Sequence, residues 1–75
     1  MLIWGGNLKK IMDLKAERVR NGLSQSQLAA KLNISQFTYN RKENGIVDFS
    51  LEEVKKLKKE LKLTSRQINN IFFKD

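Results

Sequence analysis

Residues 25–45 of this chain are QSQLAAKLNISQFTYNRKENG, a pattern typical of two short helices joined by a tight turn. Asn33 lies in the turn, and after glycine asparagine is the residue that best tolerates a positive φ. Apolar side chains recur where two crossing helices must pack, at Leu28, Ala29, Leu32, Ile34 and Tyr39. The segment therefore predicts a helix-turn-helix corner, with helices at about 25–32 and 36–44.

The rest of the chain also has helical periodicity and contains no proline. A first helix is expected to end at Asn21-Gly22, and its periodic apolar residues are Leu8, Ile11, Met12, Ala16 and Val19. Two more helices are expected at about 51–62 and 65–73. The residues that they should bury are Leu51, Val54, Leu57 and Leu61 in the first and Ile68, Ile71 and Phe72 in the second. Five short helices with brief connections predict a compact all-α domain.

Three S/T-x-x-E/Q capping boxes support these boundaries: Ser24–Gln27, Ser50–Glu53 and Thr64–Gln67. In each box the hydroxyl accepts from a backbone N–H, and the Gln or Glu side chain accepts from the backbone N–H of the capping residue. Three such signals in so short a chain indicate real helix starts.

Composition limits the function. Fifteen Lys and Arg against eight Asp and Glu give a net charge of +7, which favours a polyanionic partner over charges that only face water. The absence of Cys and His excludes disulfides, thiolate chemistry and ordinary zinc sites, and agrees with a reducing cytoplasm.

A domain of 75 residues has little room for a catalytic cleft, and no nucleophile–base pair or metal set is evident. Neither enzymatic activity nor a cofactor is expected. No apolar run approaches the ~20 residues of a membrane span.

One set of residues between Leu14 and about Leu63 is characteristic in its spacing: Arg18, Gly22-Leu23-Ser24-Gln25, Leu28-Ala29, Lys31-Leu32, Ile34-Ser35 and Glu43-Asn44-Gly45. This pattern resembles the phage repressor/Cro type of helix-turn-helix domain, the Xre family. The resemblance implies a five-helix, lambda-repressor-like DNA-binding domain over residues 14–75, preceded by an N-terminal extension and the start of helix one in residues 1–13. The ending Asn70–Phe73 resembles members from phages and mobile elements of low-GC Gram-positive bacteria.

The resemblance also implies a DNA-binding surface on the second helix of the corner. Gln25 would hydrogen-bond a phosphate and brace that helix, while Gln36 suits adenine, Arg41 guanine and Phe37 thymine methyls. The expected DNA-binding residues are Gln25, Ser35, Gln36, Phe37, Thr38, Asn40, Arg41 and Asn44. Among them, two are expected to contact only the DNA backbone, which positions without specifying: Ser35 and Asn44.

Several side chains keep two interpretations. Phe37 either contacts the groove or packs onto the preceding helix, and Asn40 contacts either a base or a phosphate. Lys42 stands where many family members keep a large apolar residue, and its stem could lie over Tyr39 with the ammonium offered to a phosphate. By the resemblance, Arg18 and Glu43 form a structural ion pair.

The termini and the helix expected at about 51–62 are less informative. The lysines of that helix are interpreted as a solvated face: Lys55, Lys56, Lys58, Lys59 and Lys62. Met12 is either the natural start or follows a segment whose Trp4 packs against Phe72 or across a dimer. The C-terminal apolar residues form a dimer face or close the monomer's own core: Ile68, Ile71, Phe72 and Phe73.

The expected function is that of a small phage or mobile-element repressor, in the bacterial cytoplasm and bound at its operator in the nucleoid. Its partner would be double-stranded DNA, with a possible homodimer and no small-molecule ligand or membrane. Because the chain ends soon after helix five, no separate ligand or dimerisation domain is expected. The alternative is an antitoxin-like or coactivator-like protein-interaction module on the same fold.

Overall fold

The computed structural model describes residues 4–73, and the side chains of residues 12–73. The described chain forms five α-helices: α1 (Trp4–Arg20), α2 (Gln25–Lys31), α3 (Gln36–Glu43), α4 (Leu51–Glu60) and α5 (Ser65–Ile68). A π-helical segment, Asn69–Phe73, continues directly from α5. No strand occurs in residues 4–73, so the expected all-α fold is confirmed. The expected positions of the Trp4, Leu8 and Ile11 side chains lie outside the described residues.

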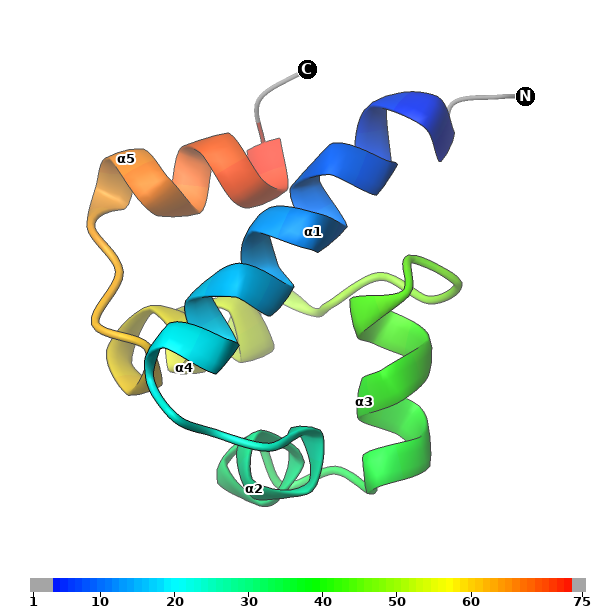
Figure 1. The fold of residues 1–75 in the computed structure, drawn as a ribbon, viewed down its shortest axis with the longest axis vertical. Coiled ribbons are helices and arrows are strands. Elements are labelled where there is room, and N and C mark those ends of the chain that lie inside the picture. The colour runs from blue at the N-terminus through cyan, green and yellow to red at the C-terminus, as the bar shows by residue number, and fades with distance from the viewer. Residues whose placement is uncertain (1–3, 74–75) are drawn as a thin grey trace.

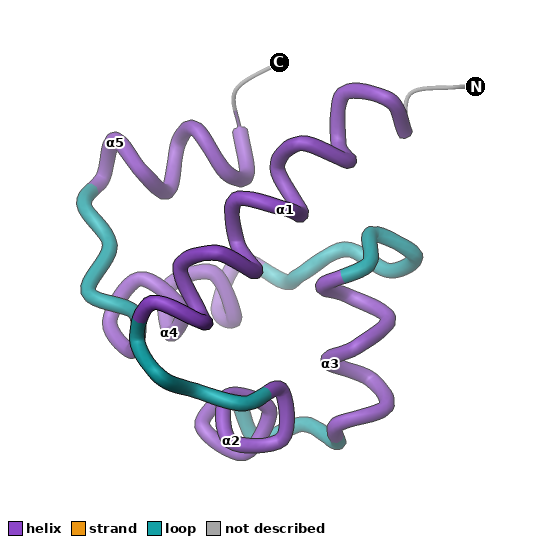
Figure 2. The backbone as a smooth tube through the Cα atoms, in the orientation of Figure 1, coloured by secondary structure: helices purple, strands orange, loops and turns teal. Residues whose placement is uncertain are grey.

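The helices surround one interior (Figure 1). Helix α1 crosses the front of the molecule, with α4 behind it and α5 beside it. Helices α2 and α3 meet at a steep angle at the end of the molecule away from the two termini. There α2 is seen almost along its axis, and α3 runs vertically in the view. The longest connection runs from α3 to α4 and passes behind α1 (Figure 2). Helix α3 therefore lies at the edge of the molecule, with one side free.

Helices α1 to α4 all end in the same backbone turn. The residue after each helix cap has a left-handed conformation: Gly22 (φ 71°), Asn33 (φ 63°), Gly45 (φ 80°) and Lys62 (φ 55°). At the end of α2, the Asn33 N–H donates to Ala30 O and the Ile34 N–H to Ala29 O, both at 3.0 Å. The corresponding two bonds close α1, α3 and α4, which makes each end a Schellman motif. Lys62 was expected to be helical but is the left-handed residue that ends α4.

Three connections between helices share one three-residue pattern, which we call the connector. A left-handed residue is followed by an apolar residue and then by a hydroxyl residue that caps the next helix: Gly22-Leu23-Ser24, Asn33-Ile34-Ser35 and Lys62-Leu63-Thr64. Leu63 is buried in the core, and Leu23 and Ile34 pack against it. The three predicted capping boxes are present, at Ser24, Ser50 and Thr64. Each connector thus satisfies the end of one helix and the start of the next.

The core takes side chains from all five helices and from the segment after α5. Tyr39 and Leu57 are fully enclosed, and Leu28 and Ala29 fill the crossing of α2 and α3. The other members are Leu14, Leu32, Val54, Leu61, Leu63, Ile68 and Ile71. The apolar faces predicted for the corner and for helix five are therefore largely confirmed.

Four of the residues used to predict apolar faces are exposed: Leu51, Met12, Ala16 and Val19. Leu51 is 64% exposed because it is the first residue of α4, ahead of the buried row that starts at Val54. The expectation that Leu51 is buried was wrong. On α1, Met12, Ala16 and Val19 are exposed, and Leu14 and Arg18 face the interior instead.

An aromatic cluster is centred on Phe49, which lies in the loop from α3 to α4. The Phe49 ring lies 5.9 Å from the Tyr39 ring and 5.7 Å from the Phe72 ring, measured between centroids. The second pair is edge-to-face, an arrangement that aromatic rings prefer. Phe49 thereby connects α3 to the C-terminal segment. Within the described residues, no helix has both the length and the apolar character needed to cross a membrane.

Candidate nucleic-acid interface

A buried ion pair fixes the C-terminal end of α3 against α1. Arg18 Nε donates to Glu43 Oε2 at 2.8 Å, and Arg18 Nη2 donates to Glu43 Oε1 at 3.3 Å. The remaining Nη1 group donates to the backbone oxygen of Leu23 at 2.8 Å. Because both side chains are almost completely buried, the predicted structural pair is present and shielded from water.

Two more donors converge on the Glu43 carboxylate. The Tyr39 hydroxyl donates to Oε2 at 2.6 Å, and Gln25 Nε2 donates to Oε1 at 2.8 Å. Burial alone would raise the pKa of Glu43, but the hydrogen bonds from Arg18, Tyr39 and Gln25 hold it below its ordinary value. The hydrogen bond to Glu43 raises the pKa of Arg18, although burial opposes this. Both members of the pair therefore stay charged at neutral pH.

A chain of amides leads from this buried centre to the surface of α3. Gln25 Oε1 accepts from Asn40 Nδ2 at 3.2 Å, and Asn40 Oδ1 accepts from Asn44 Nδ2 at 3.2 Å. Gln25 is half-buried and connects α2 to α3, so the bracing role expected of it is confirmed. Its contact with a phosphate stays a prediction, as do the DNA contacts of Asn40 and Asn44.

The N-terminal end of α3 is held by its own capping residue. Ser35 Oγ accepts from the backbone N–H of Thr38 at 3.1 Å and donates to Thr38 Oγ1 at 2.9 Å. Five of the eight expected DNA-binding residues thus take part in hydrogen bonds that hold α3 in place: Gln25, Ser35, Thr38, Asn40 and Asn44.

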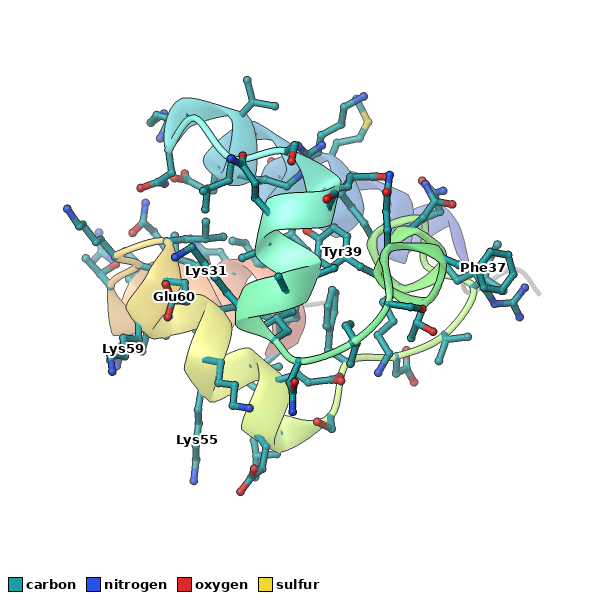
Figure 3. All side chains as sticks on the ribbon, turned by 90° about the horizontal axis from the view of Figure 1, so that it is seen from below. Lys31, Phe37, Tyr39, Lys55, Lys59 and Glu60 are labelled. Atoms are coloured by element: carbon teal, nitrogen blue, oxygen red, sulfur yellow. The ribbon has the colours of Figure 1, made fainter. Side chains whose placement is uncertain are left out.

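The other three residues point outward from α3: Gln36, Phe37 and Arg41. Phe37 is 72% exposed and projects away from α2 (Figure 3), so the alternative in which it packs onto the preceding helix is wrong. Tyr39 points the opposite way, into the interior. Among the described side chains, none accepts a hydrogen bond from Gln36 or Arg41. These groups are available to a partner on the exposed side of α3.

Lys42 has a structural partner that the sequence interpretation missed. Its ammonium lies 2.6 Å from Glu53 Oε1 and 5.9 Å from the centroid of the Phe49 ring. Burial would raise the pKa of Glu53, but the hydrogen bonds from Lys42 and from the Ser50 backbone lower it. Lys42 therefore joins α3 to α4 and lies near Phe49, so the interpretation that offered its ammonium to a phosphate is not supported. Glu53 was assigned only to a capping box, and nothing local marked its second partner.

A family model described as helix-turn-helix matches residues 14–69. The chain belongs to the Cro/C1-type helix-turn-helix family. It is therefore a DNA-binding helix-turn-helix regulator by family. No curated protein and no solved structure gives a match.

The basic side chains of α4 lie elsewhere on this Cro/C1-type domain. Lys55 and Lys59 point into solvent, well away from Phe37 (Figure 3). Lys31 bridges α2 and α4 through Glu60 at 3.4 Å. All five predicted lysines of the solvated face are exposed: Lys55, Lys56, Lys58, Lys59 and Lys62.

The C-terminal apolar residues lie mostly inside the Cro/C1-type domain. Ile68 and Ile71 are buried in the core, and Phe72 is half-buried against it. Phe73 is 57% exposed. Ile68 and Ile71 thus close the monomer's own core, the second of the two predicted uses. A dimer face involving these residues stays a prediction that rests on Phe73 and the exposed part of Phe72.

Proposed function

We propose that this Cro/C1-type protein is a sequence-specific transcriptional repressor of a phage or mobile element, which recognises its operator with α3. One observation supports this most strongly. The inner side of α3 is held by the buried Arg18–Glu43 pair, while its outer side presents Gln36, Phe37 and Arg41, which form no hydrogen bond or ion pair through their side chains among the described residues. A helix so placed suits the major groove, which admits one α-helix.

The proposed complex divides contacts between base edges and backbone. Gln36 would pair with adenine, Arg41 with guanine, and Phe37 would contact thymine methyls. Gln25, Ser35 and Asn44 would contact phosphates, which sets register without specifying sequence. The net charge of +7 favours approach to DNA and a salt-dependent affinity. Repression would follow from occupancy alone, because a bound protein blocks polymerase, and it would take place in the bacterial cytoplasm, at the operator in the nucleoid.

Two copies would bind a palindromic operator, with half-sites about 10 bp apart. A stable interface buries about 800 Å² on each partner. Since Ile68 and Ile71 are already buried, the exposed apolar surface at Phe73 is too small for that by itself. We therefore propose that the dimer forms on the operator rather than free in solution.

Selection from random duplex DNA, followed by salt titration, tests the proposal. We expect enrichment of one palindrome, with binding that weakens steeply as salt rises. Arg41→Ala should weaken binding to that site by roughly 5- to 150-fold, the discrimination given by one bidentate base contact. Arg66→Ala removes the same charge from the exposed surface of α5 and serves as the matched control.

The same selection experiment also tests the alternative function, a protein-interaction module. If no sequence is enriched and only weak binding remains, lost at moderate salt, the protein-interaction module would be favoured and the repressor would be rejected. An equal loss in Arg41→Ala and Arg66→Ala would show that general charge, not recognition by α3, provides the affinity.

A further inference from the structure

Phe37 and Arg41 lie one turn apart on the exposed side of α3 and contact each other. The Arg41 guanidinium carbon is 5.5 Å from the centroid of the Phe37 ring, within the range of a cation–π interaction. The ring itself is 72% exposed, so it adds little to the core. These two side chains, the Phe37–Arg41 pair, are therefore already associated before any partner binds.

The Arg41 charge has no acidic partner within the described part of the chain. Four other cations of the domain face carboxylates: Arg18 faces Glu43, Arg20 faces Glu17, Lys31 faces Glu60 and Lys42 faces Glu53. Among the described residues, no carboxylate lies within 4.0 Å of the Arg41 guanidinium. Stacking on a ring occupies the face of a guanidinium but leaves the N–H groups at its edge free to donate. The Phe37 ring thus orients the Arg41 guanidinium, while its N–H groups have no hydrogen-bond acceptor among the described side chains.

We infer that the Phe37–Arg41 pair recognises a guanine and a thymine in neighbouring base pairs of each operator half-site. The inference rests on the proposed function. Guanine presents N7 and O6, which accept two N–H groups of one arginine, and thymine presents a methyl group that an aromatic ring can cover. Stacked bases are about 3.4 Å apart. Two side chains held in contact therefore suit adjacent base pairs and cannot contact bases several steps apart.

Contact between the two side chains also makes their contributions dependent on each other. The Phe37 ring restricts the rotamers of Arg41, so that less conformational freedom is lost when the guanidinium meets guanine. Removing the ring should weaken recognition of guanine as well as of thymine. Two residues that act independently would instead show additive effects.

Base analogues in the selected operator test this directly. Deoxyuridine in place of thymine removes one methyl group, and 7-deazaguanine in place of guanine removes the N7 acceptor. We expect deoxyuridine to weaken wild-type binding about fourfold, the value of one buried methyl group. It should have no effect on Phe37→Ala. The 7-deazaguanine substitution should weaken wild-type binding about fivefold or more, weaken Phe37→Ala binding less, and leave Arg41→Ala binding unchanged.

Leu51→Ala is the matched control, because Leu51 is also a largely exposed apolar residue, at the start of α4. It should keep both analogue effects at wild-type size. Phe37→Ala should melt at the wild-type temperature, which separates a recognition defect from unfolding. An equal 7-deazaguanine effect in wild type and Phe37→Ala would overturn the inference. A selected palindrome without neighbouring thymine and guanine would also overturn it while the proposed function stands, and failure to select any sequence would overturn both.

Discussion

Glu43 joins three helices through one carboxylate. It accepts from Arg18 of α1, Gln25 of α2 and Tyr39 of α3, at distances from 2.6 to 3.3 Å. The pairing with Arg18 was predicted through the family resemblance. The bond from Gln25 was not, because partners 18 residues apart are brought together only by the packing of α2 on α3. The bond from Tyr39, one turn before Glu43 on the same helix, was missed because Tyr39 was assigned only to the core. Glu43 thus fixes the placement of α3 against α1 and α2.

Removing Arg18 should therefore destabilise the whole domain. Arg18→Ala leaves the Glu43 carboxylate buried without its counter-charge, and we expect the free energy of unfolding to fall by about 3–5 kcal/mol. Denaturant unfolding measures this. Arg20→Ala is the control, since Arg20 forms an exposed pair with Glu17 that should contribute at most about 1 kcal/mol. Equal unfolding midpoints for the two variants would contradict the buried role of Arg18.

The same carboxylates should make stability depend on pH. The pKa values of Glu43 and Glu53 are lowered in the folded state from an ordinary value of 4.5. The stability that these groups provide is therefore fully present above pH 4.5 and is lost as pH falls through their folded pKa values. At the steepest, each should contribute a slope of about 1.4 kcal/mol per pH unit.

Urea unfolding at a series of pH values from neutral to acidic tests this dependence. The variant Arg18→Met/Glu43→Gln, which replaces both charges of the buried pair, should show a shallower decline in acid. A decline as steep as that of wild type would mean that other groups cause the acid sensitivity.

At the scale of elements, local signals were the most predictable. The three capping boxes depend on residues three positions apart, and all three formed where expected. The exposed position of Leu51 was missed because periodicity does not show where on a helix the buried row begins. The left-handed turn at Lys62 was missed because lysine carries no signal for positive φ. The recurring connector, an apolar residue followed by a capping hydroxyl, could have revealed it.

Lys62 offers a stabilising substitution. Its φ of 55° costs a residue with a Cβ atom more than it costs glycine, which is preferred at this position of a Schellman motif. We expect Lys62→Gly to raise the free energy of unfolding by about 0.5–1 kcal/mol. Lys55→Gly, inside the same helix, should lower it by about 1 kcal/mol. Thermal melts of the two variants test this expectation. A loss of stability in both would show that Lys62 is not strained.

At the scale of the molecule, the residues that stabilise the fold and the residues proposed to recognise DNA lie on opposite sides of α3. The core and the buried ion pair hold the inner side, whereas Gln36, Phe37 and Arg41 lie outside both. The all-α fold was predictable from periodicity and caps. The sorting of the eight expected DNA-binding residues into bracing and outward groups was not, because it depends on hydrogen bonds between α2 and α3.

Association should depend on DNA. We expect sedimentation to give a monomer of 8.7 kDa for the free protein and two copies on one palindromic operator. Phe73→Ser should reduce cooperative binding of the second copy without lowering the melting temperature, since Phe73 is exposed. A stable dimer without DNA would contradict the proposal that the dimer forms only on the operator.

The connector Asn33-Ile34-Ser35 has a consequence for how such a domain can change its target. Its first residue ends α2 and its last residue begins α3, so it contains no spare length. One inserted or deleted residue would turn α3 by about 100° about its axis. That rotation would carry Glu43 away from Arg18 and swing the outward side chains toward the interior. A new operator preference can therefore arise by exchanging outward residues of α3, whereas a change in connector length would abolish folding and recognition together.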